Sequence, residues 1–149
     1  MERHAMSDTT TAAGNTKVAR PTPLAEDLAR PYWDGARRGQ LILQQCSACG
    51  KRRHYPQVLC STCYSDRWAS VEASGRGKVH SWTITHHAFH PAFAGDLPYA
   101  LLTVDLDEGV RALGLARGID FASLRIGLPV KASFAIGDDG FGRLTFVPG

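Results

Sequence analysis

The chain has 149 residues, which suits one domain or two small ones, and its 44% hydrophobic content is ordinary for a soluble globular protein. No apolar run approaches the ~18 residues that a membrane-spanning helix needs, so such a helix is excluded. The net charge of +3 is uneven, because residues 1–78 carry 12 Lys and Arg against 7 Asp and Glu, whereas residues 79–149 carry 5 against 7. The basic surplus of the first half suits a nucleic acid, an acidic partner or a phosphate-rich small molecule, and it does not choose among them.

Residues 1–21 predict a disordered tail. They are mostly small, polar and aperiodic, and they lack the apolar core of a secretory signal peptide. The missing signal, together with the paired thiols described below, predicts a cytoplasmic protein.

Residues 22–40 predict a helical segment. Thr22 can cap a first short helix that has Pro23 at its first position. Residues 31–38 predict a second short helix, and Gly39 is placed to end it in the left-handed conformation.

The four cysteines carry the most specific chemistry in the sequence. They form two Cys-x-x-Cys pairs: Cys46 with Cys49, and Cys60 with Cys63. Two such turns give the tetrahedral sulfur cage that zinc prefers, and four thiolates leave no open position for water or substrate. Residues 41–70 are therefore predicted to form a zinc ribbon whose metal is structural.

Three other interpretations of the cysteines are a pair of disulfides, a redox dithiol and an iron site. Disulfides belong to secreted proteins, and a redox Cys-x-x-Cys requires one pair beside a βαβ pattern rather than two pairs. Iron in a rubredoxin-like site is the main chemical competitor, because a cage of four sulfurs accepts both metals.

Residues 71–149 predict a five-stranded barrel. From Lys78 the apolar pattern alternates with a period of two. The predicted strands cover residues 78–86, 99–106, 110–117, 128–136 and 141–147. A short helix between the third and fourth strands, capped by Asp120 and stopped by Gly127, gives the element order of an OB barrel.

Strand alternation also assigns side chains to faces. The first strand places Trp82 and Ile84 on one face, with Trp82 among apolar neighbours as if buried. The third strand places Leu113 and Leu115 together on one face.

Two further groups of residues could carry chemistry. His86, His87 and His90 look metal-like, but neighbouring residues on a strand point to opposite faces, so the loop 87–98 is better interpreted as a contact surface. Asp105, Asp107 and Glu108 are interpreted as solvated charges at a hairpin tip.

The order of these parts resembles a known family, the zinc-ribbon plus OB-fold proteins that accompany thiolase-like enzymes, first catalogued without a known function. The resemblance spans roughly residues 22–136. The segments that carry it are PYWDGARRGQLILQQCSACG, YPQVLCSTCYS with Trp68, SGRGKVHSWT, LPYALLTVDLDEGVRALG and LRIGLPVKASF.

The resemblance implies a mainly β protein with short N-terminal helices, a rubredoxin-like zinc ribbon and an OB-fold barrel. It also implies a non-catalytic subunit that binds a thiolase-like or hydratase subunit, in a heterotetramer that acts on acyl-CoA and is required for the partner's activity. Such a subunit helps to form the partner's CoA channel. Lys51, Arg52 and Arg53 are the candidates for contacting CoA phosphates, although a run of charges of this kind usually faces water.

Two competing functions remain at the level of sequence. Zinc ribbons and OB folds often bind nucleic acids, and the first half of the chain is basic. An independent enzyme that acts at the histidine loop is the third interpretation. The predicted second and third strands offer little aromatic surface for stacking bases, so an accessory subunit that binds no nucleic acid and no membrane is the preferred interpretation.

Overall fold

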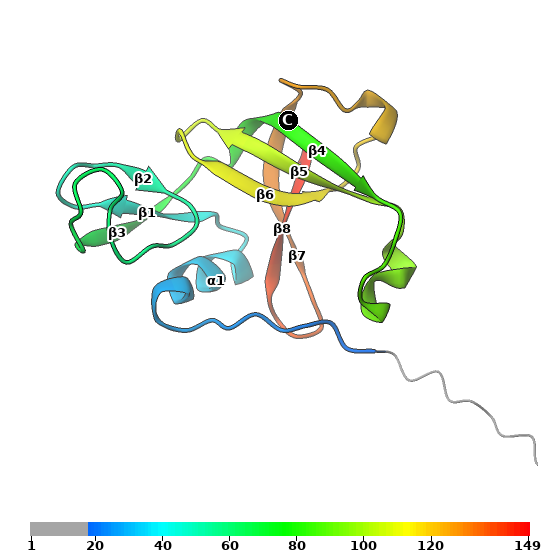
Figure 1. Cartoon of the computed structure of the whole chain (residues 1–149), viewed down its shortest axis with the longest axis horizontal. Coiled ribbons are helices and arrows are strands. Elements are labelled where there is room, and N and C mark those ends of the chain that lie inside the picture. Colours follow the sequence, from blue (N-terminus) through cyan, green and yellow to red (C-terminus); the bar gives the residue numbers. More distant parts are fainter. Residues whose placement is uncertain (1–17) are drawn as a thin grey trace, which may run out of the picture.

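The computed structural model describes residues 18–149, which form a small sheet, a helix and a barrel (Figure 1). The short sheet has the strand order β2-β1-β3, and the barrel is closed with the order β4-β5-β6-β8-β7. The predicted tail over residues 1–21 falls mainly on residues 1–17, which lie outside the described residues.

The bounds of the elements follow the chain. The helical elements are η1 (Asp27–Ala29), α1 (Arg30–Arg37), η2 (Pro91–Asp96) and η3 (Phe121–Ser123), where η marks a 3₁₀ helix. The strands are β1 (Ile42–Cys46), β2 (Arg52–Arg53), β3 (Trp68–Glu72), β4 (Arg76–Thr85), β5 (Tyr99–Leu106), β6 (Arg111–Ala116), β7 (Pro129–Ile136) and β8 (Gly142–Pro148).

Helix α1 confirms the second predicted helix. The prediction of a first helix that begins at Pro23 was wrong. No regular element is present over residues 18–26, and the side chain of Leu24 is 80% exposed. A helix this short is marginal unless an apolar face packs against something, and Leu24 has no surface to cover. Helix α1 ends where Gly39 adopts a φ of 76°, as predicted.

Two glycines let α1 lie close to both neighbouring parts of the molecule. A Cβ on Gly35 would lie 2.3 Å from Cγ1 of Ile42 in β1. A Cβ on Gly142 in β8 would lie 2.3 Å from the carbonyl oxygen of Ala36. Helix α1 therefore lies between the ribbon and the barrel at a distance that larger residues would not permit (Figure 1).

The barrel confirms the predicted OB-fold. Its strands match the predicted ranges within about two residues, and β6 and β8 close it through the parallel pairs Leu115 with Thr145 and Ala116 with Phe146. Phe146 and Leu102 are fully buried at its centre. The short helix between β6 and β7 is the single 3₁₀ turn η3, where Oδ1 of Asp120 accepts a hydrogen bond from the backbone N–H of Ala122 at 3.1 Å.

The apolar face predicted on the third strand points outward. Ala112 and Gly114 of β6 face the core, while Leu113 is 47% exposed. A Cβ on Gly114 would lie 2.9 Å from the ring of Phe146, so the large side chain from β8 occupies the space on the core side of β6. The alternation of the two faces was predicted correctly, but which face points inward depends on a residue of another strand.

Trp82 is more exposed than predicted. Its apolar neighbours in the sequence indicated a buried side chain. A register shift between Val79 and Ser81 bends β4, and in the described structure β4 pairs with β7 only over Arg76–Lys78. Trp82 therefore lies on the half of β4 that β7 leaves uncovered, and it is 36% exposed.

Candidate functional site

The four cysteine sulfurs meet at one point of the ribbon. All four Sγ atoms lie within 4.8 Å of one another, and the pairs Cys46–Cys63 and Cys49–Cys60 are each 3.6 Å apart. A tetrahedral zinc–thiolate cage with bonds of about 2.3 Å places its sulfurs about 3.8 Å apart. A disulfide requires about 2.05 Å, so the four cysteines are free thiols arranged as metal ligands.

Two similar turns build this cage. The backbone N–H of Gly50 donates to the carbonyl of Cys46 at 3.0 Å, and the N–H of Tyr64 donates to the carbonyl of Cys60 at 2.9 Å. Both turns end in the left-handed region, with φ values of 73° at Gly50 and 58° at Tyr64. The second turn therefore holds a tyrosine where the first holds the residue that this conformation favours.

The surroundings of the sulfurs shift the pKa values of the cysteines in different directions. Backbone N–H groups of Thr62 and Cys63 donate toward Cys60 and lower its pKa to about 6. The backbone N–H of Ser65 favours the thiolate of Cys63, but the neighbouring thiols and burial outweigh it and raise the pKa of Cys63 to about 12. Four thiolates this close require a cation between them, and the closed donor set fits zinc in a structural role.

The three basic residues after the first turn do not form one cluster. Lys51 and Arg52 are exposed, and Nε of Arg52 donates to Oε1 of Gln45 at 3.3 Å. Arg53 is only 7% exposed, and its Nε donates to Oε1 of Gln44 at 2.7 Å. The separation follows from β2, since successive residues of a strand point to opposite faces.

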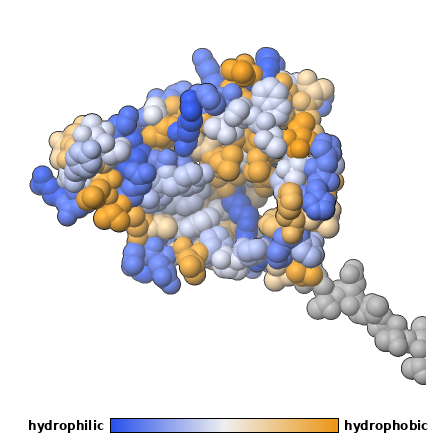
Figure 2. Space-filling model, viewed as in Figure 1, coloured by the Kyte–Doolittle hydropathy of each residue, from blue (hydrophilic) through white to orange (hydrophobic). Residues whose placement is uncertain are grey.

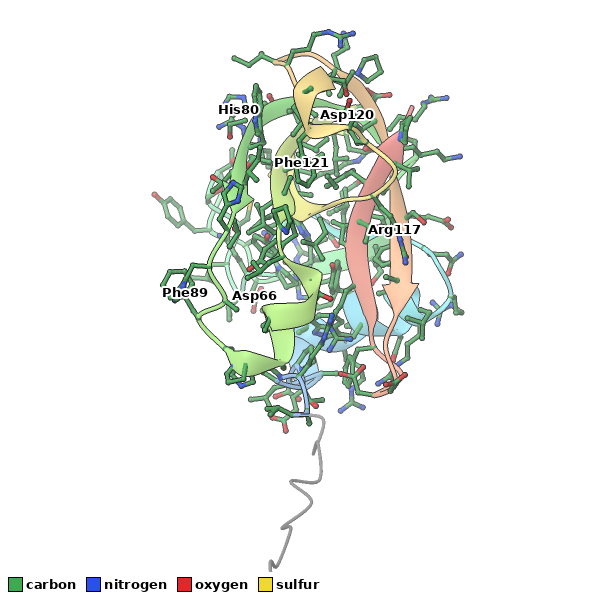
Figure 3. All side chains as sticks on the ribbon, turned by 90° about the vertical axis from the view of Figure 1, so that its right-hand side faces the viewer. Asp66, His80, Phe89, Arg117, Asp120 and Phe121 are labelled. Atoms are coloured by element: carbon green, nitrogen blue, oxygen red, sulfur yellow. The ribbon has the colours of Figure 1, made fainter. Side chains whose placement is uncertain are left out.

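The histidine loop forms no cluster of ligands. Within residues 18–149, the cysteine quartet is the one group of three or more His, Cys, Asp or Glu side chains close enough to hold a metal. Nδ1 of His90 accepts a hydrogen bond from the backbone N–H of Ala92 at 3.2 Å and so caps η2. The ring of His87 lies against Phe89, which is 91% exposed and projects from the edge of the molecule (Figure 3).

A charged network on the barrel was missed by the sequence analysis. Nδ1 of His80 lies 2.9 Å from Oδ2 of Asp105, and Nε of Arg111 donates to Oδ1 of the same carboxylate at 2.6 Å. The hydrogen bond from Arg111 is the main cause of a lowered pKa at Asp105. The three residues lie on β4, β5 and β6, so only the strand register could have brought them together.

The other two acids of the predicted hairpin tip have separate partners. Asp107 lies 3.4 Å from Arg76 across an exposed ion pair, and Oε1 of Glu108 accepts a hydrogen bond from the backbone N–H of Ser74 at 2.7 Å. Each of them stabilises the junction where the chain leaves the ribbon and enters β4.

Two exposed apolar surfaces complete the description. The outward face of β5 and β6 carries Leu101 opposite Leu115 and Thr103 opposite Leu113. The second cysteine turn exposes Val58 and Tyr64, at 66% and 77%. Figure 2 shows hydrophobic residues both over the middle of the barrel and at the end of the molecule that holds the ribbon. Among the described residues, no helix has the length and apolar character needed to cross a membrane.

Two family models match consecutive parts of this chain. The ChsH2 rubredoxin-like zinc ribbon domain matches residues 33–69, and the ChsH2 C-terminal OB-fold domain matches residues 70–135. These descriptions agree with the cysteine cage and the closed barrel.

Two individual proteins are also similar to this chain in sequence. The chain is 38% identical over 114 residues to a probable enoyl-CoA hydratase alpha subunit of Thermomonospora curvata, covering 76% of this chain and 35% of that subunit. It is 30% identical over 105 residues to a DUF35 domain-containing scaffold protein of Methanocaldococcus jannaschii, covering 67% of this chain and 74% of the relative. The chain therefore spans about a third of the hydratase subunit and most of the scaffold protein.

A solved structure described as an Ltp2-ChsH2(DUF35) aldolase matches with a TM-score of 0.77 and 34% sequence identity. The match covers 85% of this chain and 98% of that chain.

Proposed function

Since the chain belongs to the ChsH2 (DUF35) family of zinc-ribbon and OB-fold proteins, we propose that it is a non-catalytic accessory subunit of a thiolase-like acyl-CoA enzyme. The partner would make or break a C–C bond next to the thioester, or hydrate the acyl chain. The observation that carries this proposal is the match to nearly the whole length of one chain of a structure named as an aldolase. A hydratase alpha subunit and a scaffold protein among the relatives support the same class of role.

The chemistry of the described residues supports a partner role. The cysteine cage is closed, so its metal has no open position at which a substrate could bind. In contrast, Leu113 and Phe89 expose apolar surface of the kind that protein interfaces cover. In this proposal the zinc ribbon and barrel shape the partner's channel, and the partner supplies the reacting groups.

Lys51 and Arg52 are proposed to lie near the phosphates of CoA. Both side chains are exposed, as a contact with a phosphate requires. Arg53 does not share this role, because its terminal nitrogens are buried within the ribbon. Replacing Lys51 and Arg52 together by Gln should raise the KM of the complex for acyl-CoA and leave assembly unchanged.

Co-expression tests the proposal directly. A tagged chain should co-purify with a co-expressed thiolase-like or hydratase subunit, in a complex with two copies of each chain by light scattering. Acyl-CoA turnover should require both chains. Leu113→Asp should weaken assembly at least tenfold if the outer face of β5 and β6 is the interface, whereas Lys131→Asp, at an exposed position of β7, serves as the control.

Two outcomes would contradict the proposal. One is turnover by the isolated chain that is lost when one of its own histidines is replaced. The other is a chain that stays alone and binds single-stranded oligonucleotides with a steep salt dependence, as a nucleic-acid-binding OB protein would.

A further inference from the structure

One half of β4 has a free backbone edge. The strand pairs with β5 along nearly its whole length. Its other edge pairs with β7 only over Arg76–Lys78, and the backbone of Val79 then bonds to Gly127 and Leu128. Beyond Val79, no other element in the described part of the chain forms backbone hydrogen bonds with this edge. Figure 3 shows His80 and Phe89, which bracket the free half of the strand, at the same margin of the molecule.

The register indicates which backbone groups this edge presents. The backbone of Val79 bonds away from β5, so the β5 residue opposite it bonds away from β4. Bonding directions alternate along a strand, and the next residue of β5, Thr103, therefore bonds to Ser81. Trp82 and Ile84 consequently direct their N–H and C=O groups toward the free edge. Trp82 is 36% exposed and Ser81 is exposed, so this part of the strand is open to solvent.

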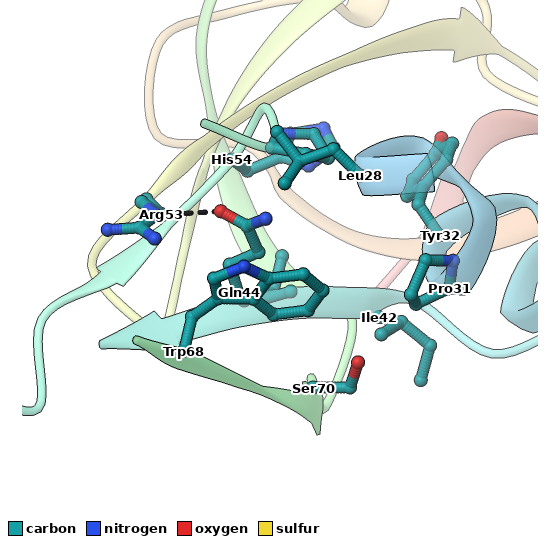
Figure 4. Close-up of a pocket in the computed structure, with 11 residues that line it drawn as sticks. Leu28, Pro31, Tyr32, Ile42, Gln44, Arg53, His54, Trp68 and Ser70 are labelled. Carbon is teal, nitrogen blue, oxygen red and sulfur yellow. Dashed lines mark hydrogen bonds between the residues drawn. The ribbon is translucent and has the colours of Figure 1, made fainter. Parts of the chain in front are cut away.

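The sequence of this edge lacks the usual protection against pairing with another strand. Natural edge strands are kept apart by charged residues, prolines or very short lengths. In the ribbon, the edge strand β2 has only two residues, both arginines, and Figure 4 shows Arg53 hydrogen-bonded to Gln44 of β1. In β4 and the loop after it, residues 79–90 contain no Asp, Glu, Lys, Arg or Pro. The free edge is therefore suited to pairing.

The free edge is complementary to a second copy of itself. In an antiparallel pair centred on Thr83, Trp82 lies opposite Ile84 of the other copy, and both residues direct their backbone groups toward the contact. The two residues can exchange both N–H···O bonds, and two-fold symmetry repeats the pair. An aromatic residue opposite a β-branched residue is a favourable cross-strand pair. On the other face, the hydroxyl side chains of Ser81 and Thr85 lie opposite each other, which is also favourable.

We propose that the free edge of β4 pairs with the same edge of a second copy of this chain, which joins the two barrels through one continuous sheet. A second copy fits because each side chain over residues 81–85 meets a suitable one and no like charges lie opposite each other. The contact has two-fold symmetry, the commonest arrangement of two identical chains. It concerns this chain alone and does not depend on the proposed function.

Sedimentation velocity of the metal-loaded full chain, without any partner subunit, tests this contact. The wild type should sediment with twice the mass of one chain. Thr83 is exposed, and Thr83→Lys or Thr83→Glu would place like charges opposite each other at the two-fold axis. Each variant should raise the Kd of the dimer by at least about tenfold. An equal mixture of the two variants should restore the dimer, because Lys then lies opposite Glu.

Leu113→Asp is the matched control. It introduces a charge on the outer face of the same sheet, two strands from the free edge, and should leave the dimer intact. A wild-type chain that is monomeric at every concentration would overturn the proposal. A dimer that Thr83→Lys leaves intact would also overturn it, and so would a loss of the dimer that mixing the two variants does not reverse. A monomer whose binding to a partner subunit is abolished by Thr83→Lys would assign the edge to that subunit, which overturns this inference while the proposed function stands.

Discussion

The ribbon and the barrel are stabilised in different ways. The barrel closes around an apolar core in which Phe146 and Leu102 are fully buried. The ribbon's second turn leaves Val58, Leu59 and Tyr64 at least half exposed, and its sheet includes a strand of two residues. The β1 strand of the ribbon shares the apolar core through Leu43, so the difference lies at the cysteine end, where four thiolates joined by a metal replace apolar packing.

Removing the metal should have the largest effect and should separate the two regions. Cys60→Ser removes one of the four ligands and so weakens the binding of a metal whose total binding free energy is on the order of 10 kcal/mol. Amide hydrogen exchange should show lost protection across residues 46–65, while the amides of β5 and β8 stay protected. Ser47→Ala in the first turn is the control, because its side chain is exposed. A purified protein with this fold and with neither zinc nor iron by mass spectrometry would contradict the comparison.

Truncating the centre of the barrel should have the next largest effect and should not depend on metal. Phe146→Ala leaves a cavity at a fully buried position and should lower the free energy of unfolding by about 3–5 kcal/mol. Leu113→Ala, on the outward face, should cost less than about 1 kcal/mol, since its side chain is already half exposed. Urea denaturation measures both values, and equal losses would mean that the two faces of β6 are assigned incorrectly.

A titratable group in the ribbon should make the folded protein sensitive to acid. Burial lowers the pKa of His54 to about 4 from an ordinary value of 6.5. Between these values the unfolded chain binds a proton that the folded protein does not, so the free energy of unfolding falls as the pH drops from 6.5 toward 4, by about 3 kcal/mol in full.

The variant His54→Asn isolates this contribution. The difference in stability between wild type and variant should shift against the wild type by about 3 kcal/mol between pH 7.5 and pH 4.5. Metal content measured at each pH is the control, because metal release affects both proteins. A difference that stays constant with pH would show that His54 is accessible to protons in the folded protein.

The smallest expected effect compares the two cysteine turns with each other. Tyr64 has a φ of 58°, and a left-handed conformation costs a residue with a Cβ about 1–2 kcal/mol. Tyr64→Gly should therefore raise the free energy of unfolding by about 1 kcal/mol, and Gly50→Ala, at a φ of 73°, should lower it by a similar amount. Guanidinium titrations of the two variants measure this, and a loss in Tyr64→Gly would mean that the tyrosine ring supplies contacts that offset its strain.

The sequence predicted those features that depend on local pattern. Residues 99–106 alternate so regularly that the predicted strand coincides with β5, and the spacing of the cysteines alone predicted where the sulfurs meet. The local pattern could not predict which face of β6 points to the core. That depends on Phe146 of β8, whose ring leaves no room for a side chain at Gly114.

The burial of Arg53 was missed for a related reason. A strand of two residues is too short to show a period, so nothing local distinguished Arg53 from the exposed Arg52. The network of His80, Asp105 and Arg111 is likewise a property of register rather than of spacing.

The close approach at Gly35 and Gly142 bears on how tightly this protein could associate with another. Because α1 touches β1 on one side and β8 on the other, the ribbon and the barrel are held at one mutual angle, without a flexible linker between them. A partner that contacted both would meet two preorganised surfaces and would lose little conformational entropy in ordering them. Enlarging either glycine should therefore slow or weaken association even though neither residue lies on an exposed face.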